Sequence, residues 1–202
     1  REVRVKMKAS GICGSDLHVY RGTDARDWIQ GHESSGIVDK LGANVSKLKL
    51  GDRVTIHHHQ GCGQCYYCSK GDFVWCQDDK VLSGSFGDYI VANERNCVPL
   101  PDQISFIDGT FFACAGTTAY AALRRLGVVA HLPQTIAVYG LGPVGLSTVR
   151  VGKAMGARVI GIDIVEERLR IAKKCGADAV VNAGGPWSYL IAEMAESVLP
   201  TA

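Results

Sequence analysis

Four cysteines between residues 62 and 76 have the residue type and spacing of a metal site. Cys62, Cys65, Cys68 and Cys76 follow the pattern C-x2-C-x2-C-x7-C. Thiolates this close together can converge on one ion, and zinc takes four of them in a tetrahedron at about 2.3 Å. A site of four cysteines has no open coordination position, so it holds the chain in shape rather than doing chemistry. The cluster therefore predicts a structural zinc site.

Two other uses of these thiols stay open as alternatives. The bacterial iron–sulfur run ends in C-x3-C-P, whereas the last gap in this chain is seven residues and Gln77 follows Cys76. A disulfide framework is typical of secreted proteins, but the N-terminus reads as an alternating strand and not as a signal peptide. Eight cysteines without a secretory signal favour a reducing compartment, where thiols bind metals or stay free.

A second group of metal-binding residue types is scattered over three segments. Cys13 and Asp16 lie in "GICGSD", His32 and Glu33 in "GHESSG", and Cys114 in "FFACAGTTAY". Each alone has an ordinary explanation, because a lone cysteine is usually a small buried hydrophobe. Together they indicate Cys/His/Cys ligation that leaves one position open for water or substrate, as a catalytic zinc requires.

A glycine-rich motif points to a nucleotide. Gly140, Gly142 and Gly145 form G-x-G-x-x-G after an apolar run, and Asp163 ends the next apolar run. Such glycines permit a tight turn and close approach of a pyrophosphate to a helix N-terminus. An acid at Asp163 accepts hydrogen bonds from ribose hydroxyls and repels a 2′-phosphate, which favours NAD over NADP. A tight strand–helix turn without a ligand is the alternative.

Composition excludes several classes of partner. The chain has 202 residues, 47% of them hydrophobic, and a net charge of +2. It has no run of five or six like charges and no 18-residue apolar stretch, which predicts neither nucleic-acid nor membrane binding. We expect a cytoplasmic protein.

The elements that must position these residues differ between the two parts of the chain. Alternating or β-branched runs bounded by turn residues predict strands near 1–7, 34–41, 51–57 and 87–94. Later, strands near 134–140, 158–163 and 178–183 alternate with helices near 143–157, 165–177 and 186–199. Strands alternating with helices imply a parallel sheet. We predict a β-rich domain at 1–126 and an α/β domain at 127–202.

Three βα units are only half of a doubly wound nucleotide domain. We therefore expect this chain to be cut off within such a domain.

The order of these motifs resembles that of the zinc-dependent medium-chain dehydrogenase/reductase family of alcohol and polyol dehydrogenases. The motifs are, in order, "GICGSD", "GHESSG", "GDRV", the cysteine cluster, "ACAGTTAY" and "GLGPVG". The resemblance runs from about residue 8 to residue 183 and implies a GroES-like catalytic domain followed by a partial Rossmann domain. It also implies a catalytic and a structural zinc ion, NAD, a small alcohol or carbonyl substrate and, for full-length members, a homo-oligomer.

The resemblance further implies roles for individual residues. At the metal, Cys13, His32 and Cys114 match the catalytic zinc ligands, Glu33 matches a carboxylate beside the zinc, and Asp16 matches the acid that orients the histidine ligand. Ser15 and His18 match the path by which the substrate proton leaves. At the cofactor, Thr118 matches a nicotinamide contact, Pro143 and Val144 match the cofactor loop, and Arg168 matches a basic residue along the adenosine. The implied reaction is hydride transfer between an alcohol or polyol and NAD. The alternative is a catalytically inactive, zinc-stapled, nucleotide-binding fragment of such an enzyme.

Four histidines and two cysteines match no position of the family. We expect His57, His58 and His59 to be polar residues at a strand end that can line the cleft. The alternation of a strand would split them between two faces, and we do not predict a third metal site. His131, Cys97 and Cys175 are expected to be ordinary side chains.

Overall fold

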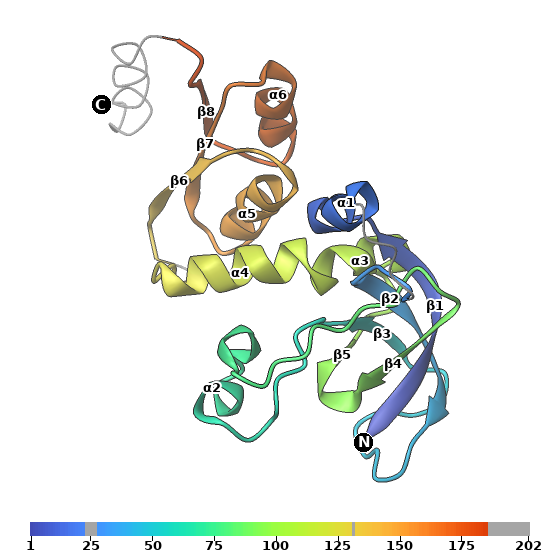
Figure 1. Ribbon diagram of the computed structural model, residues 1–202. Coiled ribbons are helices and arrows are strands. Elements are labelled where there is room, and N and C mark those ends of the chain that lie inside the picture. Colours follow the sequence, from blue (N-terminus) through green and yellow to red (C-terminus); the bar gives the residue numbers. More distant parts are fainter. Residues whose placement is uncertain (23–27, 131, 186–202) are drawn as a thin grey trace. The chain divides into compact units, whose positions relative to one another are not determined.

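The structure is a computed structural model that describes residues 1–22, 28–130 and 132–185. The chain divides into two compact units, Arg1–Cys114 and Ala115–Ala202. Figure 1 shows an antiparallel sheet in the first unit and a parallel sheet with helices in the second. In the described part of the chain, every helix is too short or too polar to cross a membrane.

The first unit is built on a five-stranded antiparallel sheet with the order β4-β1-β2-β3-β5. Its strands are β1(Glu2–Gly11), β2(Glu33–Leu41), β3(Arg53–Ile56), β4(Tyr89–Asn93) and β5(Cys97–Pro99). The four strands predicted from alternation are thereby confirmed, and β5 is additional. In β1 the register with β2 shifts near Val5 and again after Met7. Such shifts bend a strand.

The core of this sheet comes from the alternation that predicted the strands. Val3 and Val5 of β1 and Val54 and Ile56 of β3 are at most 1% exposed. Each such side chain contributes about 1.5–3 kcal/mol by leaving water. Pairing of Val5 with Val38 of β2 and Ile90 of β4 places the same face of three strands in one core.

Between its strands along the chain, the first unit contains helices that were not predicted. They are α1(Gly14–Arg21), α2(Tyr66–Ser69), the 3₁₀-helices η1(Phe73–Trp75) and η2(Glu94–Asn96), and α3(Phe106–Ala113). Helix α3 packs on β1, β2 and β3. The Oγ atom of Ser105 accepts a hydrogen bond from the Asp108 N–H at 3.0 Å and so caps the N-terminus of α3.

The second unit is a three-stranded parallel sheet in the order β6-β7-β8. Its elements are α4(Ala115–Arg125), β6(Thr135–Tyr139), α5(Pro143–Ala154), β7(Arg158–Asp163), α6(Glu166–Lys174) and β8(Ala179–Asn182). The predicted order of strands and helices is confirmed through β8. The helix predicted at 186–199 and His131 lie outside the described residues.

Helix α4, which was not predicted, belongs to the second unit. It packs against α5, and Leu123 of α4 is fully buried in a core with Val149 of α5 and Val159 of β7. The second unit therefore begins at Ala115, ahead of the change in sequence character at 127. The domain boundary at 126/127 stays a prediction.

Candidate functional site

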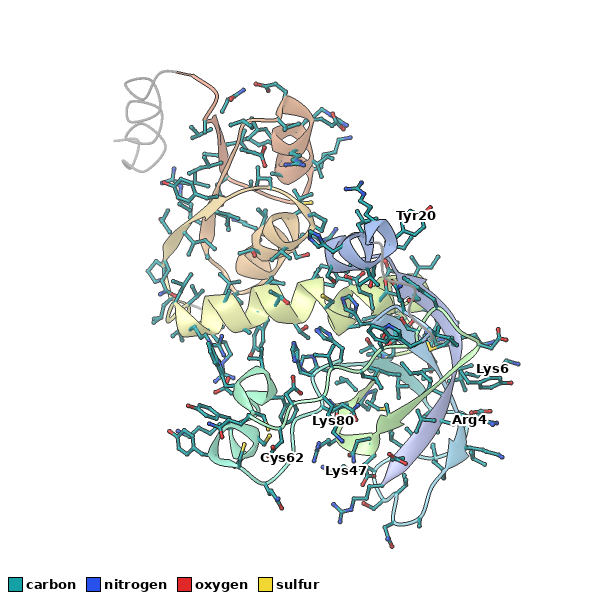
Figure 2. The ribbon with its side chains drawn as sticks, in the orientation of Figure 1. Arg4, Lys6, Tyr20, Lys47, Cys62 and Lys80 are labelled. Carbon is teal, nitrogen blue, oxygen red and sulfur yellow. The ribbon has the colours of Figure 1, made fainter. Side chains whose placement is uncertain are left out.

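The four-cysteine cluster is assembled in a small lobe of the first unit. One possible ligand atom from each of Cys62, Cys65, Cys68 and Cys76 lies within 4.8 Å of all the others. Cys65 precedes α2, Cys68 lies on α2 and Cys76 follows η1. Figure 2 labels Cys62 beside α2. Four thiols converging from one short segment are a donor set that suits tetrahedral zinc.

Close packing of the backbone holds this lobe. Gly61 has a φ of +55°, and a Cβ atom there would lie 2.6 Å from the Sγ atom of Cys68. The guanidinium of Arg95 donates to the carbonyl oxygen of Gln60 at 2.9 Å and also to that of Gly61. The turn that leads into the cluster is thus tied to η2, which sequence reasoning did not predict.

The thiols differ in acidity. Backbone N–H groups of Gln64 and Cys65 stabilise the thiolate of Cys62 and lower its pKa to about 6. The N–H of Cys62 donates to the Sγ atom of Cys76 at 3.2 Å, but burial and the thiols of Cys62 and Cys68 outweigh it and raise the pKa of Cys76 to about 11. Neighbouring thiols therefore resist simultaneous ionisation unless a cation lies between them.

The second predicted set also converges within the first unit. Ligand atoms of Cys13, His32, Glu33 and Cys114 lie within 4.8 Å of one another. Cys13 precedes α1, His32 and Glu33 stand where β2 begins, and Cys114 directly follows α3. Two thiols, an imidazole and a carboxylate fit zinc. Burial raises the pKa of Cys114 to about 12, so a cation is needed to keep this thiol ionised at neutral pH.

Asp16 connects two members of this set. Its Oδ2 atom accepts from the Cys13 N–H at 2.8 Å, and its Oδ1 atom lies 3.3 Å from Nδ1 of His32. Because the carboxylate takes the Nδ1 side of the ring, Nε2 of His32 is left for a metal.

A cavity of about 320 Å³ adjoins this set. It is lined by Ser15, Asp16, Val19, Trp28, Gln30, His32, His58, His59, Val81, Leu82 and Ser83. Ser15 and His18 lie three residues apart on α1, and both are exposed. Ser15 lines the cavity, whereas His18 is not among the described residues that line it.

The histidine triplet departs from its expected arrangement. Strand β3 ends at Ile56, so His57, His58 and His59 lie beyond it. His58 and His59 both line the cavity, in agreement with the expected place at the cleft, but β3 does not reach them and the alternation of a strand does not split this pair. Burial lowers the pKa of His58 to about 4. The metal-ligand groups found among the described residues include none of the three.

The glycine motif of the second unit forms a loop between β6 and α5. Gly140 has a φ of +84°, and a Cβ atom on Gly145 would lie 1.9 Å from the carbonyl oxygen of Gly140. A Cβ atom on Gly142 would meet nothing within 4 Å. Pro143 occupies the first turn of α5. These are the three glycine roles of a dinucleotide-binding loop. Gly140 makes the tight turn, Gly142 leaves space for the ligand to approach the backbone, and Gly145 lets the helix pack closely.

Asp163 is nearly buried at the end of β7. Its Oδ2 atom accepts from the Leu141 N–H at 2.6 Å, and its Oδ1 atom accepts from the Val165 N–H at 2.9 Å. These two bonds lower the pKa of Asp163. Arg168 lies 3.5 Å from the carboxylate. The remaining lone pairs can accept ribose hydroxyls.

Two residues assigned to the cofactor are exposed. Val144 is 44% exposed in the first turn of α5, and Thr118 is exposed on α4. Both belong to the second unit.

Asp79 was missed by the sequence reasoning. Its Oδ1 atom accepts from the Gly61 N–H at 2.9 Å and its Oδ2 atom contacts Nδ1 of His59. Although burial opposes ionisation, these bonds lower the pKa of Asp79. The acidic pair of Asp78 and Asp79, which follows Cys76 and Gln77, was the available signal.

Comparison with known proteins identifies both parts of the chain. The family model of the alcohol dehydrogenase GroES-like domain matches residues 1–102, and that of zinc-binding dehydrogenases matches residues 143–198. An alcohol dehydrogenase of Geobacillus stearothermophilus is 38% identical over an alignment 194 positions long, which covers 90% of this chain and 56% of that enzyme.

Solved structures give the same result. Galactitol-1-phosphate dehydrogenase from Escherichia coli superposes with a TM-score of 0.85 at 30% identity, over 96% of this chain and 58% of its own. The alcohol dehydrogenase rspB of Escherichia coli CFT073, complexed with NADH, superposes with a TM-score of 0.82 at 34% identity, over 96% of this chain and 59% of its own. The chain thus spans little more than half the length of these relatives. Half of its 202 residues match the GroES-like model and a later segment matches the dehydrogenase model, so the chain belongs to the zinc-dependent medium-chain dehydrogenase/reductase family.

Proposed function

We propose that this chain carries the metal and nucleotide sites of an oxidoreductase that transfers a hydride between an alcohol or polyol and NAD. The observation that carries the proposal is the convergence of Cys13, His32, Glu33 and Cys114, from three distant segments, beside a cavity. Three or four ligands next to a cavity are the arrangement of a catalytic metal.

We propose two zinc ions with different tasks. The four cysteines of the lobe close a coordination sphere and hold the lobe in shape. At the second set, zinc would supply Lewis-acid chemistry toward the substrate oxygen, and bound nicotinamide would supply the hydride acceptor.

The residues around the second set have supporting roles in the proposal. Asp16 keeps the proton of His32 on Nδ1, and Glu33 adds a carboxylate that can exchange with water or substrate. Ser15, which lines the cavity, takes the substrate hydroxyl proton and passes it toward His18. Thr118 contacts the nicotinamide.

The proposed cofactor is NAD. Gly140, Gly142, Pro143, Val144 and Gly145 receive its pyrophosphate at the N-terminus of α5. Asp163 disfavours a 2′-phosphate, and Arg168 softens that preference. NADH in the relative rspB supports this choice.

The proposed partner is a small alcohol or carbonyl compound, with homo-oligomerisation in the full-length family. A second candidate is a zinc-stapled nucleotide-binding protein without turnover, for which the four-cysteine lobe and the glycine loop would suffice. We propose the cytoplasm as its location.

Zinc content and turnover of the purified chain test the proposal. Elemental mass spectrometry should find near two zinc ions and no iron per chain, and Cys13→Ser should lose one zinc and its turnover while retaining NAD binding. Cys175→Ser, which alters a thiol outside both clusters, is the matched control. Near-normal turnover of Cys13→Ser would refute the catalytic assignment, and two zinc ions without turnover of any alcohol would favour the second candidate.

A further inference from the structure

A row of imidazole rings leads away from the candidate catalytic set along the cavity wall. The ring centroids of His32 and His58 lie 4.9 Å apart, and those of His58 and His59 lie 4.5 Å apart. All three residues line the cavity. A substrate that reaches His32 with its reacting end therefore passes His58 and extends toward His59.

The ring of His59 is held by a partly buried carboxylate. Nδ1 of His59 lies 2.5 Å from Oδ2 of Asp79, whose side chain is 12% exposed. The other oxygen of Asp79 accepts from the Gly61 N–H. A carboxylate only accepts, so the proton of the bond lies on Nδ1, and in the neutral imidazole Nε2 keeps a lone pair. Because Nδ1 is taken by Asp79 and His59 lines the cavity, Nε2 is the ring nitrogen left for a ligand.

His58 has the same polarity. Its Nδ1 atom lies 3.2 Å from the carbonyl oxygen of Ala113, which also only accepts. Nε2 of the neutral ring is again the acceptor. The wall beyond His32 thus offers two imidazole lone pairs in succession.

The backbone that carries these rings is fixed on both sides. The N–H of Leu82 donates to the His58 carbonyl at 2.8 Å, and Nδ2 of Asn96 donates to the His59 carbonyl at 2.7 Å. The N–H of Gln60 donates to the Lys80 carbonyl at 3.2 Å. A hydrogen-bond acceptor on an already ordered backbone loses less conformational entropy on binding a ligand than an acceptor on an unpaired loop.

The charge of the cavity limits what it can hold. Asp16 lines it, and the described lining residues include no lysine or arginine. A phosphate or carboxylate on the substrate would meet the Asp16 carboxylate and the imidazole acceptors, whereas hydroxyl groups can donate to them. A volume of about 320 Å³ suits a small molecule.

Resting on the proposed function, we propose that His59, positioned by Asp79, accepts a hydrogen bond from a second hydroxyl group of the substrate. His59 is then a specificity-determining residue, and the substrate class is a neutral polyol, preferred over monohydric alcohols and over phosphorylated polyols.

Substitution of His59 tests this by kinetics with xylitol and 1-propanol as probes. His59→Asn places an amide at the position of Nδ1 and removes the Nε2 acceptor, so KM for xylitol should rise roughly 3- to 10-fold, as expected for one neutral hydrogen bond. KM for 1-propanol and kcat should stay unchanged. His59→Gln, whose amide oxygen reaches the position of Nε2, should retain most of the xylitol preference.

Asp79→Asn should raise the KM for xylitol as well, because it frees the ring of His59, while Asp78→Asn at the exposed neighbour is the matched control. Equal effects of His59→Asn on both alcohols would overturn the inference while leaving the proposed function intact. Absence of turnover with either alcohol counts against the proposed function alone.

Histidine ring ¹⁵N NMR on the zinc-loaded chain tests the inference without turnover. The ring signals of His59 are assigned by their absence from the spectrum of His59→Asn. They should show that the proton lies on Nδ1, and addition of xylitol should shift the Nε2 resonance of His59. A proton on Nε2, no response to xylitol, or stronger binding of galactitol 1-phosphate than of xylitol would overturn the inference.

Discussion

At the residue scale, Gly61 combines a left-handed backbone with close approach to the thiol of Cys68, a candidate zinc ligand. Gly71 lies in the same lobe with a φ of +79°, but a Cβ atom on it would meet nothing within 4 Å. Alanine at either position should cost about 1–2 kcal/mol of folding free energy from the backbone alone. Only Gly61→Ala should also displace the Sγ atom of Cys68, which lies 2.6 Å from the new Cβ atom.

Zinc affinity therefore distinguishes the two variants. Competition with a chromogenic chelator should show weaker retention of one zinc ion in Gly61→Ala and unchanged retention in Gly71→Ala. Equal zinc retention in both variants would mean that the lobe relaxes around the extra methyl group.

The glycine loop offers a second comparison of single residues. Gly145→Ala would place a methyl group against the carbonyl oxygen of Gly140, whereas Gly142→Ala meets open space. We expect Gly145→Ala to destabilise the second unit by about 1–3 kcal/mol, as overpacking typically does. Gly142→Ala should fold normally and weaken NAD binding at least tenfold. Thermal unfolding and NADH fluorescence titration measure the two effects, and tight NADH binding by Gly142→Ala would contradict the proposed pyrophosphate contact.

Single residues also show which parts of the candidate site could be predicted from the sequence. Both metal-ligand sets were predicted, because thiols and imidazoles are rare enough for their spacing to be informative. Asp79 was not, because a carboxylate beside a lysine is ordinary in sequence and acquires its partner only when the segment near 80 pairs with the segment near 59.

At the scale of elements, α3 determines where one candidate metal ligand stands, because Cys114 directly follows its last residue. Its N-terminus depends on Ser105, whose Oγ atom accepts from the Asp108 N–H. Ser105→Ala should destabilise the first unit by about 1 kcal/mol, and Ser105→Thr should not, because it keeps a hydroxyl that accepts from the Asp108 N–H and donates to the Asp108 carboxylate. Urea unfolding of the two variants measures this. Equal stability of Ser105→Ala and the parent would show that packing on the sheet alone holds α3.

The strands and helices were unequally predictable for a physical reason. Strands with one buried face alternate visibly, as in Val3 and Val5, and α5 and α6 show helical spacing. Helices α1 and α3 are eight residues long, too short for a clear period. Helix α4 was hidden by a run of small and polar residues, and Leu123 of α4 becomes a core residue only against α5.

At the scale of the whole molecule, each compact unit has a hydrophobic core of its own and a buried carboxylate that ties a loop to it. In the first unit Glu94 is 3% exposed and accepts from the N–H groups of Ser46 and Lys47 at 2.8 and 2.9 Å. In the second unit Asp163 accepts from Leu141 and Val165. These bonds lower the pKa of both carboxyl groups below their ordinary values.

The sign of the resulting pH dependence follows from linkage. A carboxyl group whose folded-state pKa is lowered stabilises its unit fully above the unfolded value, near 4, and loses this contribution as the pH falls through the folded value. Glu94→Gln should therefore destabilise the first unit at pH 7 and flatten its stability between pH 5 and pH 3. Asp163→Asn should do the same in the second unit only.

Hydrogen exchange resolved by peptide and corrected for the intrinsic rate reports each unit separately. Both variants are compared with the parent at equal zinc content, because acid also protonates the metal ligands. Asp102→Asn, at a side chain that is 92% exposed, is the control without an expected effect. If Glu94→Gln changed protection equally in both units, the two cores would unfold as one cooperative body, and neither carboxylate could be assigned to a unit of its own.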